Sequence, residues 1–493
     1  MIQKLREYVE KFNRDDNEYY KQDISNQMAA DWMEENIPLI DIPDKVLEEI
    51  YYFRWWVFRK HIKTTSDGFV ITEFLPEVPW GGTHNTIIAA AGHHIAEAKW
   101  LKCSKMLIED YLKLWFEEKS KTYGYSSWII YSLYAYCLHV NDFSFGVENL
   151  SLLIRYYDKI EAEHMSQCGL MWSVDGVDAM EYSISGSVDG NVGSKGIRPT
   201  LNSYMAANAF AISVFAQKAG EDAISEKYMK KHLLLKEKMN EILWDEDFYK
   251  AIHIADFENP SIEKVLPENN VRELIGYIPW CFHIPPKGYE IAFAELKNET
   301  GFKSPYGLTT AEKRHPRYLY EANHECLWNG YIWPFATTQV LDAMITVLNQ
   351  YEQNTVTKED FYEVLLKYAK MHYLEEDGKM LCWIDEVKCP VDNTWSSRNI
   401  LKEMGWQKGK GGFERGKDYN HSAFCNIILS GLLGISAENG VLTVHPQIPD
   451  DWEYFSVDHL WMNGDVYKIT YDKYSDDKIL VERNHSRRVS QRI

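Results

Sequence analysis

NTIIAAAGHHIAEAKWL, residues 85–101, is the stretch that sets the fold class. It is expected to lie in one helix over residues 84–102, and nearly every position in it is apolar. A helix with apolar side chains around its whole surface must be buried on several sides. The stretch therefore predicts a helix that other helices surround.

Most of the chain before Gly434 shows a similar periodicity of about 3.6 residues, which is typical of helices. Pro199 opens one of these helices and Gly220 follows it, the usual placement of these residues at helix ends. Paired helices alternate with long loops, and no repeat of fixed period occurs, which disfavours a helical solenoid. This alternation of paired helices and long loops favours a mainly α fold, an (α/α)6 toroid with an inner and an outer ring of helices. We predict helices over residues 43–62, 84–102, 104–118, 127–140, 145–163, 199–219, 221–243, 333–350, 358–374 and 421–433.

After Gly434 the composition changes to short strand-like runs. Asn463-Gly464, between two of these runs, is a strong signal for a two-residue hairpin turn. The runs are GVLTVHP, EYFSVDHLWM, DVYKITYDKY and KILVER. The chain is therefore expected to divide into a catalytic toroid over 1–435, a small β appendage over 436–484 and a frayed tail over 485–493.

Composition narrows the possible partners. The chain has 493 residues, a net charge of −20 and 45% hydrophobic residues. An acidic surface disfavours nucleic acids and anionic membranes as partners, because both attract basic patches. The 17 Trp and 32 Tyr residues are unusually many and suit a carbohydrate cleft, where aromatic rings pack on sugar faces.

The cysteines indicate a reducing compartment. All eight are scattered, and no pair has C-x-x-C or zinc-ligand spacing. The N-terminus MIQKLREYVEKF lacks the apolar core of a signal peptide, and no window approaches about 18 uninterrupted apolar residues. We therefore expect a soluble cytoplasmic protein with no membrane span, no metal and no cofactor.

Two carboxylates lie in stretches rich in aromatic and hydrogen-bonding residues. Glu181 lies in DAMEYSISG (178–186), and Glu386 lies in CWIDEVKCPVDNTW (382–395). Hydrolysis of a glycosidic bond needs two carboxyl groups, one to protonate the leaving oxygen and one to activate water or attack carbon. Asp178, Asp175 and Asp189 are rivals to Glu181, and Glu414 in GGFERGKDYNHSAF is a rival to Glu386; the sequence leaves both choices open, and Asp189 lies outside the residues that the structure describes.

Four ordered motifs resemble glycoside hydrolase family 63 and its clan relatives, which include mannosylglycerate hydrolases. WNGYIWP (328–334) resembles the family's W-N-G-P-x-W-P segment, with Tyr331 in place of Pro. DAMEYSISG resembles G-M-D-N-S, with Glu for the catalytic Asp, and WIDEVKCPVDNTW resembles the family's Glu-containing loop. VPWGGTHNT (78–86) resembles the family's W-D-x-G-F-H segment, with Gly81 in place of Asp. The resemblance therefore implies that an acidic residue which usually hydrogen-bonds sugar hydroxyls is missing at this position. Glu73 or Glu77 is a candidate to compensate.

The resemblance implies a six-hairpin glycosidase that cleaves an α-linked glucoside or mannoside with inversion. Glu181 would be the general acid and Glu386 the general base. The implied substrate is a small oligosaccharide or glycoside. The implied sugar contacts are stacking walls from Trp80, Trp328 and Trp333, and hydroxyl contacts from His84, Arg198, His324 and Asn329.

Two other functions fit the same pattern. The first is a polysaccharide lyase or sugar epimerase on a similar toroid, and a lyase would give a product with a new double bond. The second is a carbohydrate-binding protein without catalysis, which would bind sugar and release no product. The identity of the sugar, its linkage and the oligomeric state stay open.

Overall fold

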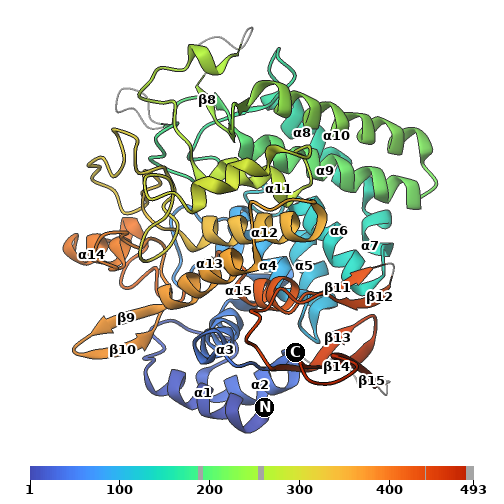
Figure 1. Ribbon diagram of the computed structural model, residues 1–493, viewed down its shortest axis with the longest axis vertical. Helices are drawn as coiled ribbons and strands as arrows, with labels where there is room; N and C mark the ends of the chain where they lie inside the picture. Colours follow the sequence, from blue (N-terminus) through green and yellow to red (C-terminus); the bar gives the residue numbers. More distant parts are fainter. Residues whose placement is uncertain (187–192, 254–259, 439, 485–493) are drawn as a thin grey trace.

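The computed structural model describes residues 1–186, 193–253, 260–438 and 440–484. The fold is mainly α-helical, as predicted, with several small sheets (Figure 1). None of the helices in the described ranges is long and apolar enough to cross a bilayer. The helices are α1 Ile2–Arg14, α2 Ala29–Asn36, α3 Lys45–Lys60, α4 Ala91–Ala98, α5 Ser104–Phe116, α6 Ile129–Val140, α7 Ser144–Glu148, α8 Leu150–His164, α9 Pro199–Lys218, α10 Asp222–Ile242, α11 Ile278–Cys281, α12 Pro334–Gln350, α13 Lys358–Met371, α14 Ser396–Glu403 and α15 Phe424–Asn426.

The helix predicted over 84–102 is shorter than expected. Only α4, Ala91–Ala98, is a regular α-helix, and two short 3₁₀ turns precede it. The side chain of Asn85 explains the difference, because it accepts a hydrogen bond from the Val78 backbone N–H and donates to the carbonyls of Phe74 and Pro76. These bonds fold the segment back as a loop. Ile87 and Ala89 consequently reach a cavity instead of a helix interface.

Deeply buried helices alternate along the chain with more exposed helices that cover them. Helix α9 is buried along almost its whole length, whereas α10 buries only Tyr228, Leu235 and Met239. The two helices pack together, as do α12 and α13 (Figure 1). An amphipathic stripe on the outer helix is the pattern expected for a helix with one face in water.

The strands of the C-terminal region form a sheet with a strand from the N-terminal region. In this antiparallel sheet, ordered β1-β13-β14-β15, Met462 pairs with Asp465 across a two-residue turn. Asn463 (φ 53°) and Gly464 (φ 78°) both have positive φ, which confirms the predicted hairpin. The edge strand β1 pairs with β13, so the predicted appendage includes residues from far outside 436–484. These strands are β1 Leu39–Asp41, β13 Tyr454–Met462, β14 Asp465–Asp472 and β15 Ile479–Asn484.

Short ladders complete the fold around the helices. They pair β2 with β3, β4 with β5 and β5 with β8, β6 with β7, β9 with β10, and β11 with β12. The predicted strand in GVLTVHP is β12, and the predicted tail lies outside the described residues. The bounds are β2 Ile62–Thr65, β3 Gly68–Ile71, β4 Trp172–Ser173, β5 Gly196–Ile197, β6 Trp244–Asp245, β7 Phe248–Tyr249, β8 Ile252–His253, β9 Tyr373–Glu376, β10 Lys379–Cys382, β11 Ile435–Glu438 and β12 Val441–Val444.

Candidate active site

A cavity of about 330 Å³ gathers acidic and aromatic side chains from loops far apart in the sequence. Glu181 and Glu386 both line it. Three of the predicted sugar contacts, Trp80, His324 and Trp333, line it as well. Loops that precede α4 and α12 form much of its wall, and loops on a rigid scaffold commonly carry function.

The loop that carries Glu181 is held in an unusual backbone conformation. Ala179 (φ 57°) and Tyr182 (φ 61°), close to it on either side, both have positive φ. Such conformations in residues other than glycine persist where the surroundings enforce them. The backbone N–H of Trp328 donates to the Glu181 carbonyl at 3.2 Å, and the Tyr320 hydroxyl donates to the Tyr182 carbonyl at 2.9 Å. Two separate segments therefore fix this loop.

The surroundings of Glu181 favour its neutral, protonated form. Burial, together with the nearby negative charges of Asp175 and Glu386, raises its pKa to about 7. Glu181 is only partly buried by its neighbours, so its carboxyl group is accessible from the cavity. A carboxyl group with this pKa can still carry a proton near neutral pH, as a general acid requires.

Asp178, one of the rivals to Glu181, is fully engaged in hydrogen bonds. Its carboxylate accepts from Arg198 Nε at 2.8 Å, from the Ser126 hydroxyl at 2.6 Å and from the Ser173 hydroxyl at 3.1 Å. It is 4% exposed and does not line the cavity. These bonds assign Asp178 and Arg198 to support of the loop that carries Glu181.

Glu386 is held by a buried arginine. Arg415 Nη2 donates to Glu386 Oε2 at 2.5 Å, and Arg415 itself has no exposed side-chain surface. Burial raises the pKa of Glu386 to about 7, although the Arg415 charge opposes this shift. The loop is also fixed by a pair of backbone hydrogen bonds between Lys388 and Ile332, each 2.9 Å. The motif with Glu386 is thereby tied to the WNGYIWP segment.

Glu414, the rival to Glu386, faces a different partner. Its carboxylate forms hydrogen bonds of 2.6 to 3.1 Å with the guanidinium of Arg398. It does not line the cavity. The arrangement is that of a structural ion pair beside the site.

Asp385 aligns the backbone next to Glu386. Its Oδ1 accepts from the Glu386 backbone N–H at 2.8 Å and from the Ser397 hydroxyl at 2.9 Å. Gly416 packs directly against this carboxylate, and a Cβ atom there would lie 1.9 Å from Asp385 Oδ1. Only glycine fits this contact without a shift of Asp385 or of the backbone.

A Gly416→Ala substitution is therefore expected to displace Asp385 and the Glu386 loop. Overpacking of this kind typically costs about 1–3 kcal/mol. We expect the urea midpoint to fall by a corresponding amount and kcat to fall with it. An alanine variant with wild-type stability and kcat would show that the contact is easily relieved.

Aromatic side chains form two walls of the cavity. Trp333 donates its indole N–H to the Leu327 carbonyl at 2.8 Å, which fixes its ring. Trp328 stacks on it, with centroids 4.5 Å apart and an interplanar angle of 20°. Trp80 lies beside Arg415, whose guanidinium is 4.9 Å from the ring centroid. Trp328 does not line the cavity itself and supports Trp333 from behind.

Three of the predicted hydroxyl contacts lie outside the lining. His84 Nε2 is paired with Asp67 Oδ2 at 2.7 Å. Arg198 is occupied by Asp178, as described above. Asn329 is fully buried, and its amide donates to the Tyr320 carbonyl at 2.7 Å. Each of these side chains stabilises a loop of the site.

Glu73 is a third carboxylate in the cavity. The Tyr419 hydroxyl donates to its Oε1, while its Oε2 is buried and has no hydrogen-bond partner among the described residues. Burial, together with the charges of Glu386 and Glu181, raises the pKa of Glu73 to about 8. Tyr419 and Arg415 come from the GGFERGKDYNHSAF segment, in which only Glu414 was predicted as a site residue. The alternation of charged and aromatic residues in this segment could have indicated that it contributes further side chains to the site.

A Glu73→Gln substitution is expected to change how stability depends on pH. The pKa of Glu73 is raised from 4.5 to about 8 in the folded chain, so its stabilising effect is present below pH 4.5 and is lost as the pH rises through 8. Wild type should therefore lose more unfolding free energy than the variant between pH 5 and pH 8. Urea unfolding at the two pH values measures this, and equal losses would contradict the raised pKa.

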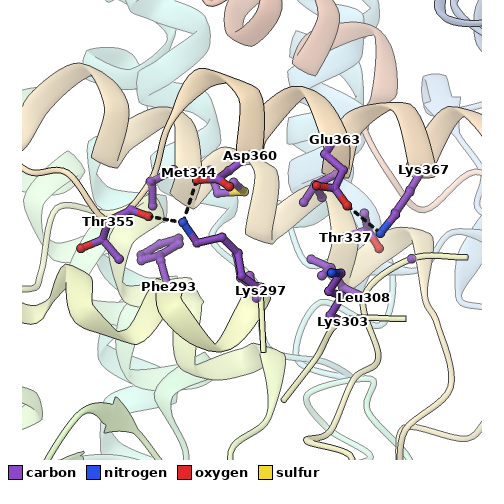
Figure 2. A pocket seen from close by; sticks show the side chains of 14 residues that line it. Phe293, Lys297, Lys303, Leu308, Thr337, Met344, Thr355, Asp360, Glu363 and Lys367 are labelled. Atoms are coloured by element: carbon purple, nitrogen blue, oxygen red, sulfur yellow. Dashed lines mark hydrogen bonds and ion pairs between the residues drawn. The ribbon is translucent and has the colours of Figure 1, made fainter. Parts of the chain in front are cut away.

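A smaller cavity of about 130 Å³ lies beside α12 and α13 (Figure 2). Its charged side chains point toward one another. Lys297 Nζ is 3.0 Å from Asp360, and Lys367 Nζ is 2.9 Å from Glu363. Because these four charged groups are already paired, they are not available to bind a sugar. Over the described ranges, no cluster of three or more His, Cys, Asp or Glu side chains is placed to hold a metal ion.

Comparison with known proteins gives the family. A family model described as the mannosylglycerate hydrolase MGH1-like glycoside hydrolase domain matches residues 83–422. The chain belongs to this family. The match confirms the resemblance to mannosylglycerate hydrolases, and the MGH1-like region includes both Glu181 and Glu386.

Longer proteins share the architecture of this MGH1-like chain. A solved structure named Sialidase has a TM-score of 0.86 and 34% identity, over 98% of this chain and 43% of that one. The GH78 family rhamnosidase of Bacillus sp. GL1 has a TM-score of 0.58 and 13% identity, over 90% of this chain and 41% of that one, and so shows the fold alone. An uncharacterized protein of Borreliella burgdorferi is 26% identical over 212 residues, which are 42% of this chain and 40% of that protein. The chain spans less than half of the length of each of these relatives.

Proposed function

We propose that this MGH1-like chain is a glycosidase that cleaves an α-linked glucoside or mannoside with inversion of configuration. One observation carries the proposal: Glu181 and Glu386 line the same cavity but differ in their ion pairing. Glu181 forms no ion pair among the described residues, whereas Glu386 is bonded to the guanidinium of Arg415. Such a difference assigns the acid role to one carboxyl group and the base role to the other.

The proposed steps use only side chains of the cavity. Glu181 donates its proton to the glycosidic oxygen as the bond to the anomeric carbon breaks. Glu386, whose ionised form Arg415 favours, takes a proton from the water that attacks the opposite face of the sugar ring. The rings of Trp80 and Trp333 pack on the sugar.

The charges of the cavity support a neutral sugar as substrate. Four glutamates, including Glu325, line it, and the ammonium of Lys410 is 3.0 Å from Glu325. Arg415 is engaged with Glu386 and Glu325. A sugar acid would meet these carboxylates without a free cation to neutralise it, which disfavours a lyase acting on uronates and a sialic acid substrate.

We further propose that the helices form the (α/α)6 toroid over residues 1–435. The packing of the buried helices α9 and α12 against the more exposed α10 and α13 supports two concentric rings. The free state of all eight cysteines supports a cytoplasmic location.

The dependence of activity on pH follows from the two carboxyl groups. Glu386 must be ionised, so kcat/KM should fall as the pH drops below about 7, and Glu181 must be protonated, so it should also fall as the pH rises above about 7. We expect a narrow bell-shaped profile with a maximum near pH 7. A flat profile from pH 5 to pH 9 would exclude this pair as acid and base.

The test of the proposed function is a screen of α-linked disaccharides and glycosyl-glycerates, followed by NMR of the first anomer formed. Hydrolysis with an inverted anomer supports the proposal, and a retained anomer contradicts the mechanism. A product with a new double bond would indicate a lyase. Binding without product, even at high protein concentration, would indicate a carbohydrate-binding protein.

A further inference from the structure

A second cavity, of about 280 Å³, lies farther along the helices that carry the candidate active site. The first cavity uses the loops before α4 and α12, whereas the second uses residues 92–99 of the α4 region and 339–350 of α12. The two linings share no residue, and at the second cavity His93 packs edge-on to Phe335 at 4.8 Å and to Trp128 at 5.0 Å. Gln350 is exposed at the rim, so the second cavity opens to solvent.

Two opposite charges line this cavity without touching. Lys99 and Asp342 have no ion pair within 4.0 Å and no hydrogen bond among the described residues, although both are partly buried. Burial lowers the pKa of Lys99 to about 8 and raises that of Asp342 to about 7. The two charges act on each other only at a distance, and Lys99 Nζ lies 5.2 Å from the centroid of the Trp100 ring. Because partly buried charges that make no direct ion pair are costly, a ligand with complementary charges between them would relieve that cost.

An uncharged polar atom is also unpaired at this cavity. His93 is 2% exposed, and its Nε2 has no hydrogen-bond partner. Burial lowers the pKa of His93 to about 3, so the ring is neutral. Because Nε2 is itself buried, the neutral ring forms part of the closed wall of the cavity and offers no hydrogen bond to a ligand.

Aromatic rings form the apolar wall of the cavity. The Trp128 indole lies against Gly92, where a Cβ atom would be 2.1 Å from the ring. Tyr131 lies beside it and packs edge-on to Phe282 at 5.1 Å. Glycine at position 92 therefore makes room for a flat apolar surface next to the two unpaired charges.

We propose that this second cavity binds a small zwitterion, an α-amino acid with an apolar side chain. Its carboxylate pairs with Lys99 and its ammonium with Asp342. Its side chain packs on Trp128 and Tyr131. A neutral sugar would leave both charges unpaired, and a simple anion or cation would satisfy only one of them. This site is separate from the glycosidase proposal and does not depend on it.

The experiment is calorimetric titration of the full chain with the standard L-amino acids at millimolar concentration. We expect saturable binding by at least one apolar amino acid. Its N-acetyl and amide derivatives, which each lack one charge, should bind about tenfold more weakly or not at all, because each loses one charge-assisted hydrogen bond. Since these derivatives are tested on wild-type protein, the result does not depend on how any variant folds.

Variants then locate the bound amino acid. Lys99→Met and Asp342→Asn should each weaken binding about tenfold or more. Lys102→Met is the matched control, because Lys102 is paired with Glu35 at 2.8 Å and lies outside the cavity. Glu181→Gln should bind as wild type does, which separates this site from the candidate active site. Absence of binding by every amino acid, equal binding of the derivatives, or unchanged binding by both cavity variants would overturn the proposal.

Discussion

Glu181→Gln and Glu386→Gln are each expected to lower kcat about 100- to 10,000-fold, the usual contribution of a general acid or base. Glutamine keeps the shape of each side chain but can neither donate an acidic proton nor remove one from water. Folding should be retained, because burial disfavours the charged form of both carboxyl groups and Arg415 keeps its ion pair with Glu325 in the Glu386 variant. The measurement is kcat on the best glycoside from the screen, with thermal unfolding recorded for each variant.

Glu414→Gln is the matched control for Glu386→Gln. Both glutamates are buried beside an arginine, but only Glu386 lines the cavity. The Glu414 variant should keep kcat within a few-fold of wild type. If it loses activity while Glu386→Gln stays active, the two assignments must be exchanged.

Arg415→Met is expected to destabilise the fold by about 3–5 kcal/mol, because loss of one partner leaves a buried charge without compensation. Arg415 is the shared partner of Glu386 and Glu325, at 2.5 and 3.1 Å. In the variant both carboxylates would be stabilised by protonation, so the loss should be larger at pH 8 than at pH 5. Urea unfolding at both pH values tests this.

Arg398→Met is the control that distinguishes a loss of stability from a change in catalysis. Arg398 forms a comparable buried pair with Glu414, at 2.6 Å, away from the cavity. This variant should also be destabilised but should keep the wild-type pH profile of kcat/KM. Arg415→Met should instead shift the acidic limb of that profile upward, since Glu386 loses the cation that favours its ionised form. An unchanged acidic limb in Arg415→Met would contradict the role of Glu386 as base.

Much of the helical fold could be predicted from the sequence, because periodicity and end signals act locally. Pro199 begins α9 and the Asn463-Gly464 turn joins β13 to β14, both as predicted. The predicted helix over 84–102 was too long because the Asn85 side chain bonds to carbonyls from residues 74 and 76, which periodicity does not report. The pairing of β1 with β13 depends on contacts distant in sequence, which no local pattern encodes.

For the candidate site too, local sequence patterns could be predicted, whereas contacts set by tertiary packing could not. The motifs led to Glu181, Glu386 and Trp333, which line one cavity, and their catalytic roles remain predictions. The motifs did not show that His84 would be paired with Asp67. They also could not show that Arg415 would lie between two glutamates, because side-chain partners are set by tertiary packing.

The pairing of β1 with β13 has a consequence for synthesis on the ribosome. Leu39 faces Asp458, so the early strand has no partner until almost all of the described chain has emerged. A strand edge that waits this long is open to pairing with other nascent chains. Expression at high ribosome density should therefore favour aggregation, and slower initiation of translation should raise the yield of native protein.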